Sequence, residues 1–177
     1  IIYTSSILGN NLSVATGIAM ALKNKSSVCI CVTGDGAIEE GSFYESLLFS
    51  KYLKLPLIFL VENNNWSMAT SIPERRTNIN LRELSNSLKI EYKHFDSSSL
   101  KKNNLTFRNV VKKTRKINSP IICEMEVFTL GFPHKNGLSD KYHHGAIKSK
   151  IVKNLFIDPI KKDVLYNTNQ KLKKKFR

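Results

Sequence analysis

The sequence lacks the long apolar runs and the cysteine pattern of membrane-spanning or disulfide-stapled proteins. A helix needs about eighteen consecutive apolar residues to cross a membrane, and no such run occurs. The opening residues, IIYTSSILGNNLS, have neither the basic head nor the long apolar core of a signal peptide, so we expect a cytoplasmic protein. Cys29, Cys31 and Cys123 are an odd number of cysteines without metal-ligand spacing. We expect them to be reduced residues of the core.

Acidic residues are also scarce. The chain has 14 Asp and Glu against 28 Lys and Arg, which gives a net charge of +14 at pH 7. Such a charge is compatible with nucleic-acid binding, but the basic residues are widely spread and the aromatic residues follow core periodicity instead of interleaving with them. We therefore predict no nucleic-acid partner, and an acidic partner subunit or an anionic substrate explains the charge as well.

The chain does contain an alternation of apolar strands and amphipathic helices. With 177 residues and 41% hydrophobic content, it is long enough for one domain with its own core. The alternation predicts an α/β fold with a doubly wound, mostly parallel sheet flanked by helices. Strands are predicted at residues 28–32, 57–61, 90–95 and 121–128, helices at 12–22, 42–52, 81–88 and 105–117, an extended start at 1–3 and a loop at 66–80.

Polar loops follow two of the predicted strands. The strand at 28–32 ends in the turn GDG at residues 34–36, and the strand at 57–61 runs into ENNN at residues 62–65. A lone GDG is common in simple turns, but the combination of strand, GDG, helix, strand and ENN is far more specific. In a right-handed βαβ unit both loops lie at the carboxyl edge of the same sheet, so we expect them to approach each other.

These loops bring together the ligands that a hard cation prefers. Asp35 offers a carboxylate and Asn64 an amide oxygen, which suit Mg²⁺ shared with phosphate groups. The backbone N–H groups of Gly36 and Ala37, just ahead of a helix, can donate to the same phosphates while the helix dipole favours their charge. The pattern therefore predicts a metal-bridged diphosphate.

The same stretch resembles a known cofactor motif. GDGAIEEGSFYE followed by LPLIFLVENNNWSMATS is similar to the thiamine diphosphate motif of the alpha subunit of 2-oxo acid dehydrogenases, of the pyruvate, branched-chain and acetoin types, within the transketolase-like superfamily. The similarity runs without a gap over residues 34–71. It implies thiamine diphosphate and Mg²⁺ as cofactors, with the metal held by the Asp35 carboxylate, the Asn64 side-chain oxygen and the Trp66 backbone carbonyl.

The resemblance also assigns residues to the rest of the cofactor. Gly34 opens the motif, and the amides of Gly36 and Ala37 hold the diphosphate. The segment SSILG…SVATGIAMALK resembles the family segment that holds the aminopyrimidine, which implies roles for Ser6 and Leu8. The alternative for these two is a helix N-cap followed by core residues.

Three charged residues near the motif have no single role implied by the resemblance. Glu40 falls where the family often has a Gln near the diphosphate; it stays unassigned because a carboxylate there would repel phosphate. In the predicted loop at 66–80, Arg75 or Arg76 could contact an anionic substrate, and the alternative is a solvated surface position.

A loop after the last predicted strand, TLGFPH, ends at His134. This is the best-placed titratable residue, and the family has a His near the diphosphate and the reacting carbon, which makes His134 our predicted catalytic residue. The alternative is a solvated loop position. The spacing from His134 to Asp140 differs from the usual pattern and lacks its Pro, and it resembles outlying family members that sit beside sugar-biosynthesis enzymes.

The resemblance covers nearly the whole chain. It implies a diphosphate-binding domain over residues 1–166, lacking the family's amino-terminal segment, and a basic tail at 167–177. The implied function is decarboxylation of a 2-oxo acid with transfer of the acyl unit, in a heterotetramer whose beta-type subunit supplies the pyrimidine-binding domain and the catalytic Glu. Glu124 and Glu126 lie in the wrong strand for that role. The alternatives are a transketolase-like or carboligase enzyme and a noncatalytic scaffold subunit.

Overall fold

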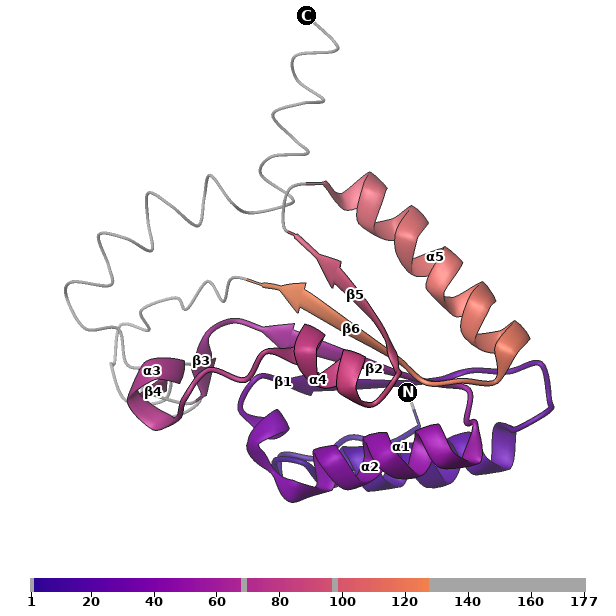
Figure 1. Ribbon diagram of the computed structural model, residues 1–177, viewed down its shortest axis with the longest axis horizontal. Coiled ribbons are helices and arrows are strands. Elements are labelled where there is room, and N and C mark those ends of the chain that lie inside the picture. Colours follow the sequence, from indigo (N-terminus) through magenta and orange to yellow (C-terminus); the bar gives the residue numbers. More distant parts are fainter. Residues whose placement is uncertain (1, 68–69, 97–98, 128–177) are drawn as a thin grey trace, which may run out of the picture.

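A four-stranded parallel sheet forms the centre of the molecule (Figure 1). The computed structural model describes residues 2–67, 70–96 and 99–127. The strands stand in the order β1-β2-β6-β5 and comprise β1 (Cys29–Gly34), β2 (Leu57–Asn63), β5 (Glu91–Phe95) and β6 (Ile121–Glu126). The predicted parallel α/β sheet is thereby confirmed.

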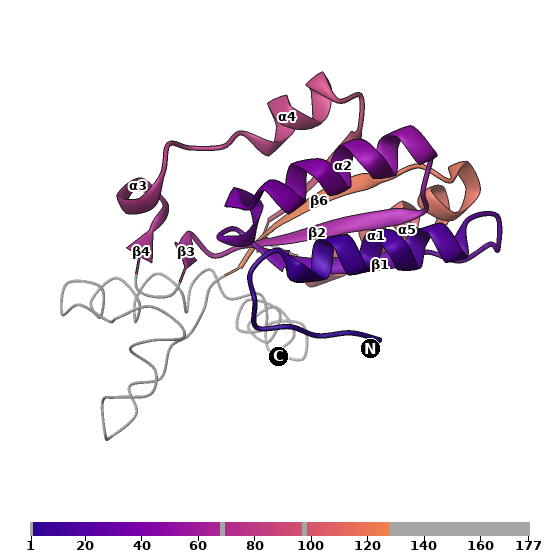
Figure 2. The same ribbon diagram turned by 90° about the horizontal axis from the view of Figure 1, so that it is seen from below.

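Helices cover both faces of this sheet, as a doubly wound fold requires. Helices α1 (Asn10–Leu22) and α2 (Gly41–Leu53) lie on one face, and α5 (Leu100–Ile117) lies on the other (Figures 1 and 2). Helix α4 (Leu81–Ser87) contributes to the same core as α1 and α2. The short elements are η1 (Ala37–Glu39), β3 (Trp66–Ser67), β4 (Thr70–Ser71) and α3 (Ile72–Arg75).

The β2 strand is apolar from Leu57 to Val61 because both of its faces are largely buried there. Leu57, Phe59 and Val61 belong to the core under α1 and α2, whereas Ile58 and Leu60 belong to the core under α5. Successive side chains of a strand point to opposite faces, so a central parallel strand needs an unbroken apolar run. This run fixes the register of β2 and so determines where its polar carboxyl end leaves the sheet.

Two predictions about local structure were wrong. Helix α5 begins at Leu100 and not at residue 105, since the Ser99 side chain accepts from the Lys102 N–H at 3.4 Å and caps a polar first turn. The predicted loop at 66–80 contains the β3-β4 pair and helix α3. There Ser71 and Glu74 form a capping box around a first turn that also contains a proline.

Other predictions are only partly covered by the described residues. Residues 2–3, predicted to be extended, pair with no strand of the described sheet. His134, the end of the predicted domain at 166 and the basic tail at 167–177 lie outside the described residues. None of the helices within the described part of the chain combines the length and the apolar character needed to cross a membrane.

Candidate functional site

The loops after β1 and β2 leave the sheet side by side. Gly34 pairs with Glu62 in the parallel register, and the Asp35 N–H donates to the Glu62 carbonyl at 3.2 Å. The two polar loops therefore begin at the same level of neighbouring strands, as predicted. This is the carboxyl edge of the sheet, where ligands bind in open parallel α/β folds.

Asp35 is buried at this edge, with 2% of its surface exposed, and it is held by an arginine. Arg75 Nη2 lies 2.6 Å from Asp35 Oδ2, and Arg76 Nη2 donates to the Asp35 carbonyl at 3.5 Å. Both arginines also pair with Glu39 Oε1, at 2.9 Å from Arg75 Nε and 2.7 Å from Arg76 Nε. Four charged groups, from the GDG turn, η1 and the end of α3, thus form one ion-pair cluster.

This cluster shows that the alternative of solvated surface positions for Arg75 and Arg76 is wrong. The side chains of Arg75 and Arg76 are only 12% and 10% exposed, and each makes an ion pair with a carboxylate. The pairing joins residues about forty positions apart, which no local pattern reveals. The Ser71-x-x-Glu74 capping box is the signal that could have located the short helix carrying Arg75.

The environment of Asp35 shifts its acidity. Burial raises the pKa of the Asp35 carboxyl above its ordinary value, although the hydrogen bond and the charge of Arg75 act in the opposite direction. A buried carboxylate is costly unless a cation accompanies it. Asp35 therefore sits in surroundings that favour a bound cation, and Arg75 fills that role in this structure.

The asparagine cluster forms a tight turn after β2. The Asn64 side-chain oxygen accepts from the Trp66 N–H at 2.9 Å, and Asn63 Oδ1 accepts from the Asn65 N–H at 3.1 Å. Asn65 has a φ of 65°, a left-handed conformation that Asn tolerates. Asn63 also donates through Nδ2 to Glu124 Oε1 at 2.8 Å, which ties the turn to β6.

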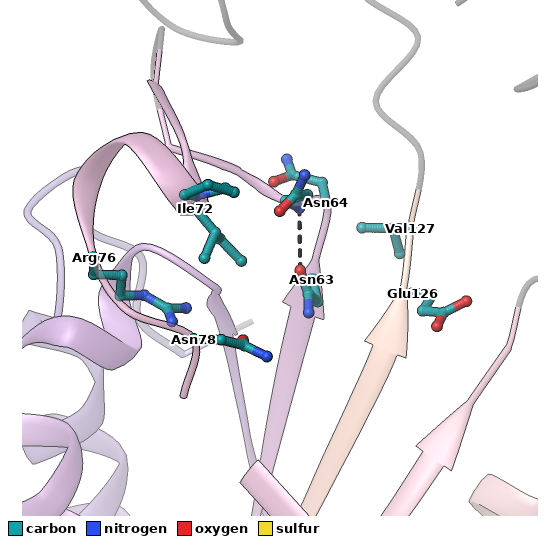
Figure 3. Close-up of a pocket in the computed structure, with 9 residues that line it drawn as sticks. Asn63, Asn64, Ile72, Arg76, Asn78, Glu126 and Val127 are labelled. Carbon is teal, nitrogen blue, oxygen red and sulfur yellow. Dashed lines mark hydrogen bonds between the residues drawn. The ribbon is translucent and has the colours of Figure 1, made fainter. Parts of the chain in front are cut away.

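A cavity of about 770 Å³ opens beside this turn (Figure 3). Asn63 and Asn64 form one wall, and Arg76 and Asn78 come from the segment after α3 on the opposite side. Glu126 belongs to the β6 rim, and its carboxyl group points away from the asparagines (Figure 3). The Asn64 side chain therefore faces a space large enough for a small-molecule ligand, whereas Asp35 is not among the residues that line it.

The glycines of the GDG turn meet different surroundings. A Cβ built on Gly36 would lie 2.7 Å from Ser67 Cβ and closer still to Ser67 Oγ, whereas a Cβ on Gly34 would meet no atom of the described residues within 4 Å. Gly36 caps the three-residue η1, with Ala37 as its first residue, and α2 begins only at Gly41. The dipole of α2 acts mainly within its own first turn, so at residues 36 and 37 only the N–H groups themselves are available to an anion.

The segment before α1 is tied to the start of α2. The Ser42 hydroxyl donates to the Gly9 carbonyl at 3.2 Å, which places the segment carrying Ser6 and Leu8 next to the element that follows GDG. The N-cap of α1 is Gly9, and Leu8 is 51% exposed, so the alternative of a Ser6 N-cap followed by a core Leu8 is wrong. Glu40 is exposed and serves as the N-cap residue of α2 without a side-chain cap bond.

The metal-ligating residues of the described chain do not form a ready cluster of their own. Within residues 2–67, 70–96 and 99–127, no group of three or more His, Cys, Asp and Glu side chains could hold a metal ion. A cation at this edge would need amide and backbone oxygens, and oxygens of a ligand, beside the one carboxylate. That donor set is the one that Mg²⁺ uses when it bridges protein and phosphate.

A parallel α/β sheet with a buried carboxylate and a polar turn at its carboxyl edge defines a ligand-binding domain of the doubly wound class. Comparison with known proteins is more specific. The chain belongs to the family described as "Dehydrogenase E1 component", whose family model matches residues 1–145. The resemblance to 2-oxo acid dehydrogenase alpha subunits is thereby confirmed.

Individual relatives agree with the family. The chain is 26% identical over 136 residues to a pyruvate dehydrogenase E1 component subunit alpha of Acholeplasma laidlawii, covering 76% of this chain and 39% of that protein. The protein of the same name from Rhizobium meliloti is 31% identical over 121 residues, covering 67% of this chain and 35% of its own length. The chain thus matches well under half the length of these relatives.

A solved structure shows the fold. A transketolase from Campylobacter jejuni superposes with a TM-score of 0.63 over 94% of this chain and 30% of its own, at 19% identity. At that identity the likeness supports the transketolase-like α/β fold and nothing about the reaction.

Proposed function

We propose that this chain is the diphosphate-binding, alpha-type part of a thiamine diphosphate-dependent enzyme that decarboxylates a 2-oxo acid and transfers the resulting acyl unit. The observation that carries the proposal is the buried Asp35 carboxylate at the carboxyl edge of the sheet, beside the asparagine turn, in a chain of the Dehydrogenase E1 component family. When bound, thiamine diphosphate supplies a thiazolium carbon that adds to a carbonyl group and acts as an electron sink.

The residues present fit such a cofactor. The donor set is oxygen only: the Asp35 carboxylate, the Asn64 side-chain oxygen and the Trp66 carbonyl, which suits Mg²⁺. Arg75 Nη1 is buried without a hydrogen-bond partner in the described residues, as expected of a donor that meets an anion. The open space above Gly34 leaves room for a group close to the backbone.

The Asn64 side chain and the Trp66 backbone are tied together. The Asn64 side-chain oxygen accepts from the Trp66 N–H at 2.9 Å. The same bond fixes the backbone ahead of the Trp66 carbonyl. We therefore assign Asn64 and Trp66 together as metal ligands beside Asp35.

The remaining site residues keep the roles that the resemblance implies. Gly36 and Ala37 would donate their N–H groups to the diphosphate, and Ser6 and Leu8 would contact the aminopyrimidine ring. His134 would approach the diphosphate and the reacting carbon, where an imidazolium stabilises a developing oxyanion.

We further propose that a beta-type subunit completes the site by supplying the Glu that activates the aminopyrimidine. Glu124 is unsuited to this task because its carboxylate accepts from Asn63 Nδ2 at 2.8 Å and from the Tyr92 hydroxyl at 2.5 Å. Glu126 points away from the asparagine turn (Figure 3). It pairs with His94 at 3.2 Å. We propose assembly with this subunit as a heterotetramer, which is what the family resemblance implies.

Calorimetric titration tests this function. Thiamine diphosphate is added to the full chain in the presence of Mg²⁺ and, separately, in the presence of EDTA, with and without the beta-type subunit. Saturable binding that requires Mg²⁺, and turnover of 2-oxo acids only in the complex, is the expected result. Absence of cofactor binding under all four conditions would favour a scaffold, and turnover of ketose donors alone would favour a transketolase-like enzyme.

A further inference from the structure

We propose that Arg75 is an internal counter-cation that holds the metal-ligating carboxylate Asp35 until Mg²⁺ arrives together with a diphosphate. Arg75 would thus be a positioning residue that lowers the affinity of the site for Mg²⁺ in the absence of a diphosphate. The proposal rests on the proposed function, because it takes Asp35 to be the metal ligand.

The contact between the two residues is close and buried. Arg75 Nη2 lies 2.6 Å from Asp35 Oδ2, and the two side chains are 12% and 3% exposed. A Mg²⁺ ion binds oxygen at about 2.0–2.1 Å. An ion on the same oxygen would lie only a few ångström from the guanidinium charge, so like-charge repulsion opposes the binding of both cations to this carboxylate.

The charges of the cluster explain why Mg²⁺ without a diphosphate binds Asp35 less favourably than the Arg75 guanidinium does. Asp35 and Glu39 are balanced by Arg75 and Arg76, all linked within 2.9 Å through the carboxylate oxygens. A lone Mg²⁺ would add two positive charges to a neutral cluster in which Asp35 and the two arginines are largely buried and Glu39 is exposed, so like charges repel around Asp35. A diphosphate entering with the ion compensates this charge.

Arg75 also has hydrogen-bond donors that an incoming anion can bind. Its Nη1 is buried without a hydrogen-bond partner among the residues that the structure describes, and its Nε lies 2.9 Å from Glu39 Oε1 without the alignment of a hydrogen bond. Leaving such donors unsatisfied costs free energy. A diphosphate oxygen would accept hydrogen bonds from Arg75 Nη1 and Nε once the Arg75 side chain turns away from Asp35. The anion would thus both offset the charge of the metal and bind the guanidinium that leaves Asp35.

The position of Arg75 on α3 connects it to the other proposed ligands. The Ile72 N–H at the start of α3 donates to the Asn65 carbonyl at 3.2 Å, and the Ser71 side chain and backbone are held by Glu74 at 2.7 and 2.9 Å. Helix α3 is thereby anchored to the asparagine turn. Arg75 and the loop that carries Asn64 therefore belong to one hydrogen-bonded segment.

The test measures Mg²⁺ affinity by titration calorimetry on the full chain, first with MgCl₂ alone and then with saturating thiamine diphosphate. Arg75→Gln should raise the affinity for Mg²⁺ alone about tenfold or more, since a charge repulsion in a buried site is removed. The factor by which the diphosphate improves Mg²⁺ binding should shrink accordingly. Glu39→Gln should lower the affinity for Mg²⁺ alone, because the cluster then carries a net positive charge and Asp35 is the only carboxylate left to pair with Arg75.

Two further variants separate this role from a merely structural one. Arg75→Lys keeps the positive charge, so its affinity for Mg²⁺ alone should stay nearly as low as that of the wild type. This variant keeps the test valid if Arg75→Gln fails to fold. Arg82→Gln removes the same charge from α4, where the Arg82 guanidinium stacks 4.9 Å from the centre of the Tyr92 ring, and should leave both affinities unchanged. A structural role would instead lower Mg²⁺ affinity in Arg75→Gln and Glu39→Gln alike.

The outcomes distinguish this inference from the proposed function. If wild type binds thiamine diphosphate with Mg²⁺ but folded Arg75→Gln binds free Mg²⁺ no better than wild type, the counter-cation role is overturned and the cofactor site stands. If wild type binds neither Mg²⁺ nor the cofactor even when both are present with the beta-type subunit, the proposed function fails and this inference fails with it.

Discussion

Ser67 packs against the backbone of Gly36 so closely that there is no room for a side chain between them. A Cβ on Gly36 would lie 2.7 Å from Ser67 Cβ, a separation that real Cβ atoms essentially never show. The φ of Gly36 is −73°, which any residue adopts. Gly36 is therefore required by the space that Ser67 takes and not by its backbone conformation. This contact fixes the GDG turn against the loop that follows the asparagine cluster.

A first prediction follows for substitutions of the two glycines. Gly36→Ala should lower the free energy of unfolding by about 1–3 kcal/mol, the usual cost of forcing an extra methyl group into a packed site. The double variant Gly36→Ala with Ser67→Gly should recover most of that loss. Gly34→Ala is the matched control, because a Cβ there meets no atom within 4 Å, and its unfolding free energy should stay close to wild type. Urea denaturation measures all three; equal loss in the double variant would contradict the packing argument.

A second prediction concerns the buried cysteines. Burial raises the pKa of the Cys123 thiol to about 12, whereas a cysteine in an unfolded chain ionises near about 8.5. The folded chain therefore keeps a proton that the unfolded chain loses, and this contribution to stability is present below the unfolded pKa and declines as the pH rises toward 12. The difference in unfolding free energy between wild type and Cys123→Ala should shrink between about pH 8.5 and 11.

Alkylation gives an independent reading of the same property. Cys123 and Cys31, whose pKa is also raised to about 12 by burial, should resist iodoacetamide at pH 8 in the native protein and react once it is unfolded in urea. Rapid labelling of the native protein at Cys123 would show that the thiol is accessible and ionised, contrary to the structure.

The sequence predicted the sheet well because burial dictates its residues. Phe59 and Ile58 face opposite cores, so β2 is apolar at every position from Leu57 to Val61, and such a run is visible without a structure. The start of α5 was missed because its first turn, LKKN, is polar and depends on the Ser99 cap. The existence of an element follows from apolar periodicity, whereas its end depends on individual hydrogen bonds.

The site was predictable only as far as strand geometry determines it. Asp35 and Asn64 were located because both follow strands of one parallel sheet. The bond from Arg75 to Asp35 was not foreseen, since it depends on how a four-residue helix folds back over the sheet edge. Long-range charge pairing leaves no periodic trace in a single sequence.

A third prediction separates the two roles of Asn64. Asn64→Ala removes both the proposed metal ligand and the acceptor for the Trp66 N–H, so it should lower stability by about 1 kcal/mol and weaken Mg²⁺-dependent cofactor binding. Asn64→Asp keeps an oxygen at this position and should retain more of the affinity. Thermal unfolding and calorimetry on both variants check this; a cofactor affinity in Asn64→Ala equal to wild type would remove Asn64 from the metal site.

A fourth prediction concerns the chain by itself. If a beta-type subunit supplies the catalytic Glu, the purified chain with saturating thiamine diphosphate and Mg²⁺ should release no CO₂ from 2-oxo acids above background. Addition of the beta-type subunit should restore turnover, and His134→Ala should then reduce the rate by about ten- to a thousandfold. Robust decarboxylation by the single chain would contradict the idea of a site shared between subunits.

The central claim is that the Asp35 carboxylate holds Mg²⁺ for a diphosphate cofactor, and calorimetry on Asp35→Asn tests it most directly. The substitution keeps the size of the side chain and removes its charge, so Mg²⁺-dependent binding of thiamine diphosphate should be lost. Glu91→Gln is the matched control, because that carboxylate pairs with Lys93 at 3.3 Å and Lys113 at 2.6 Å and should leave cofactor affinity unchanged. Wild-type affinity in folded Asp35→Asn would contradict the account.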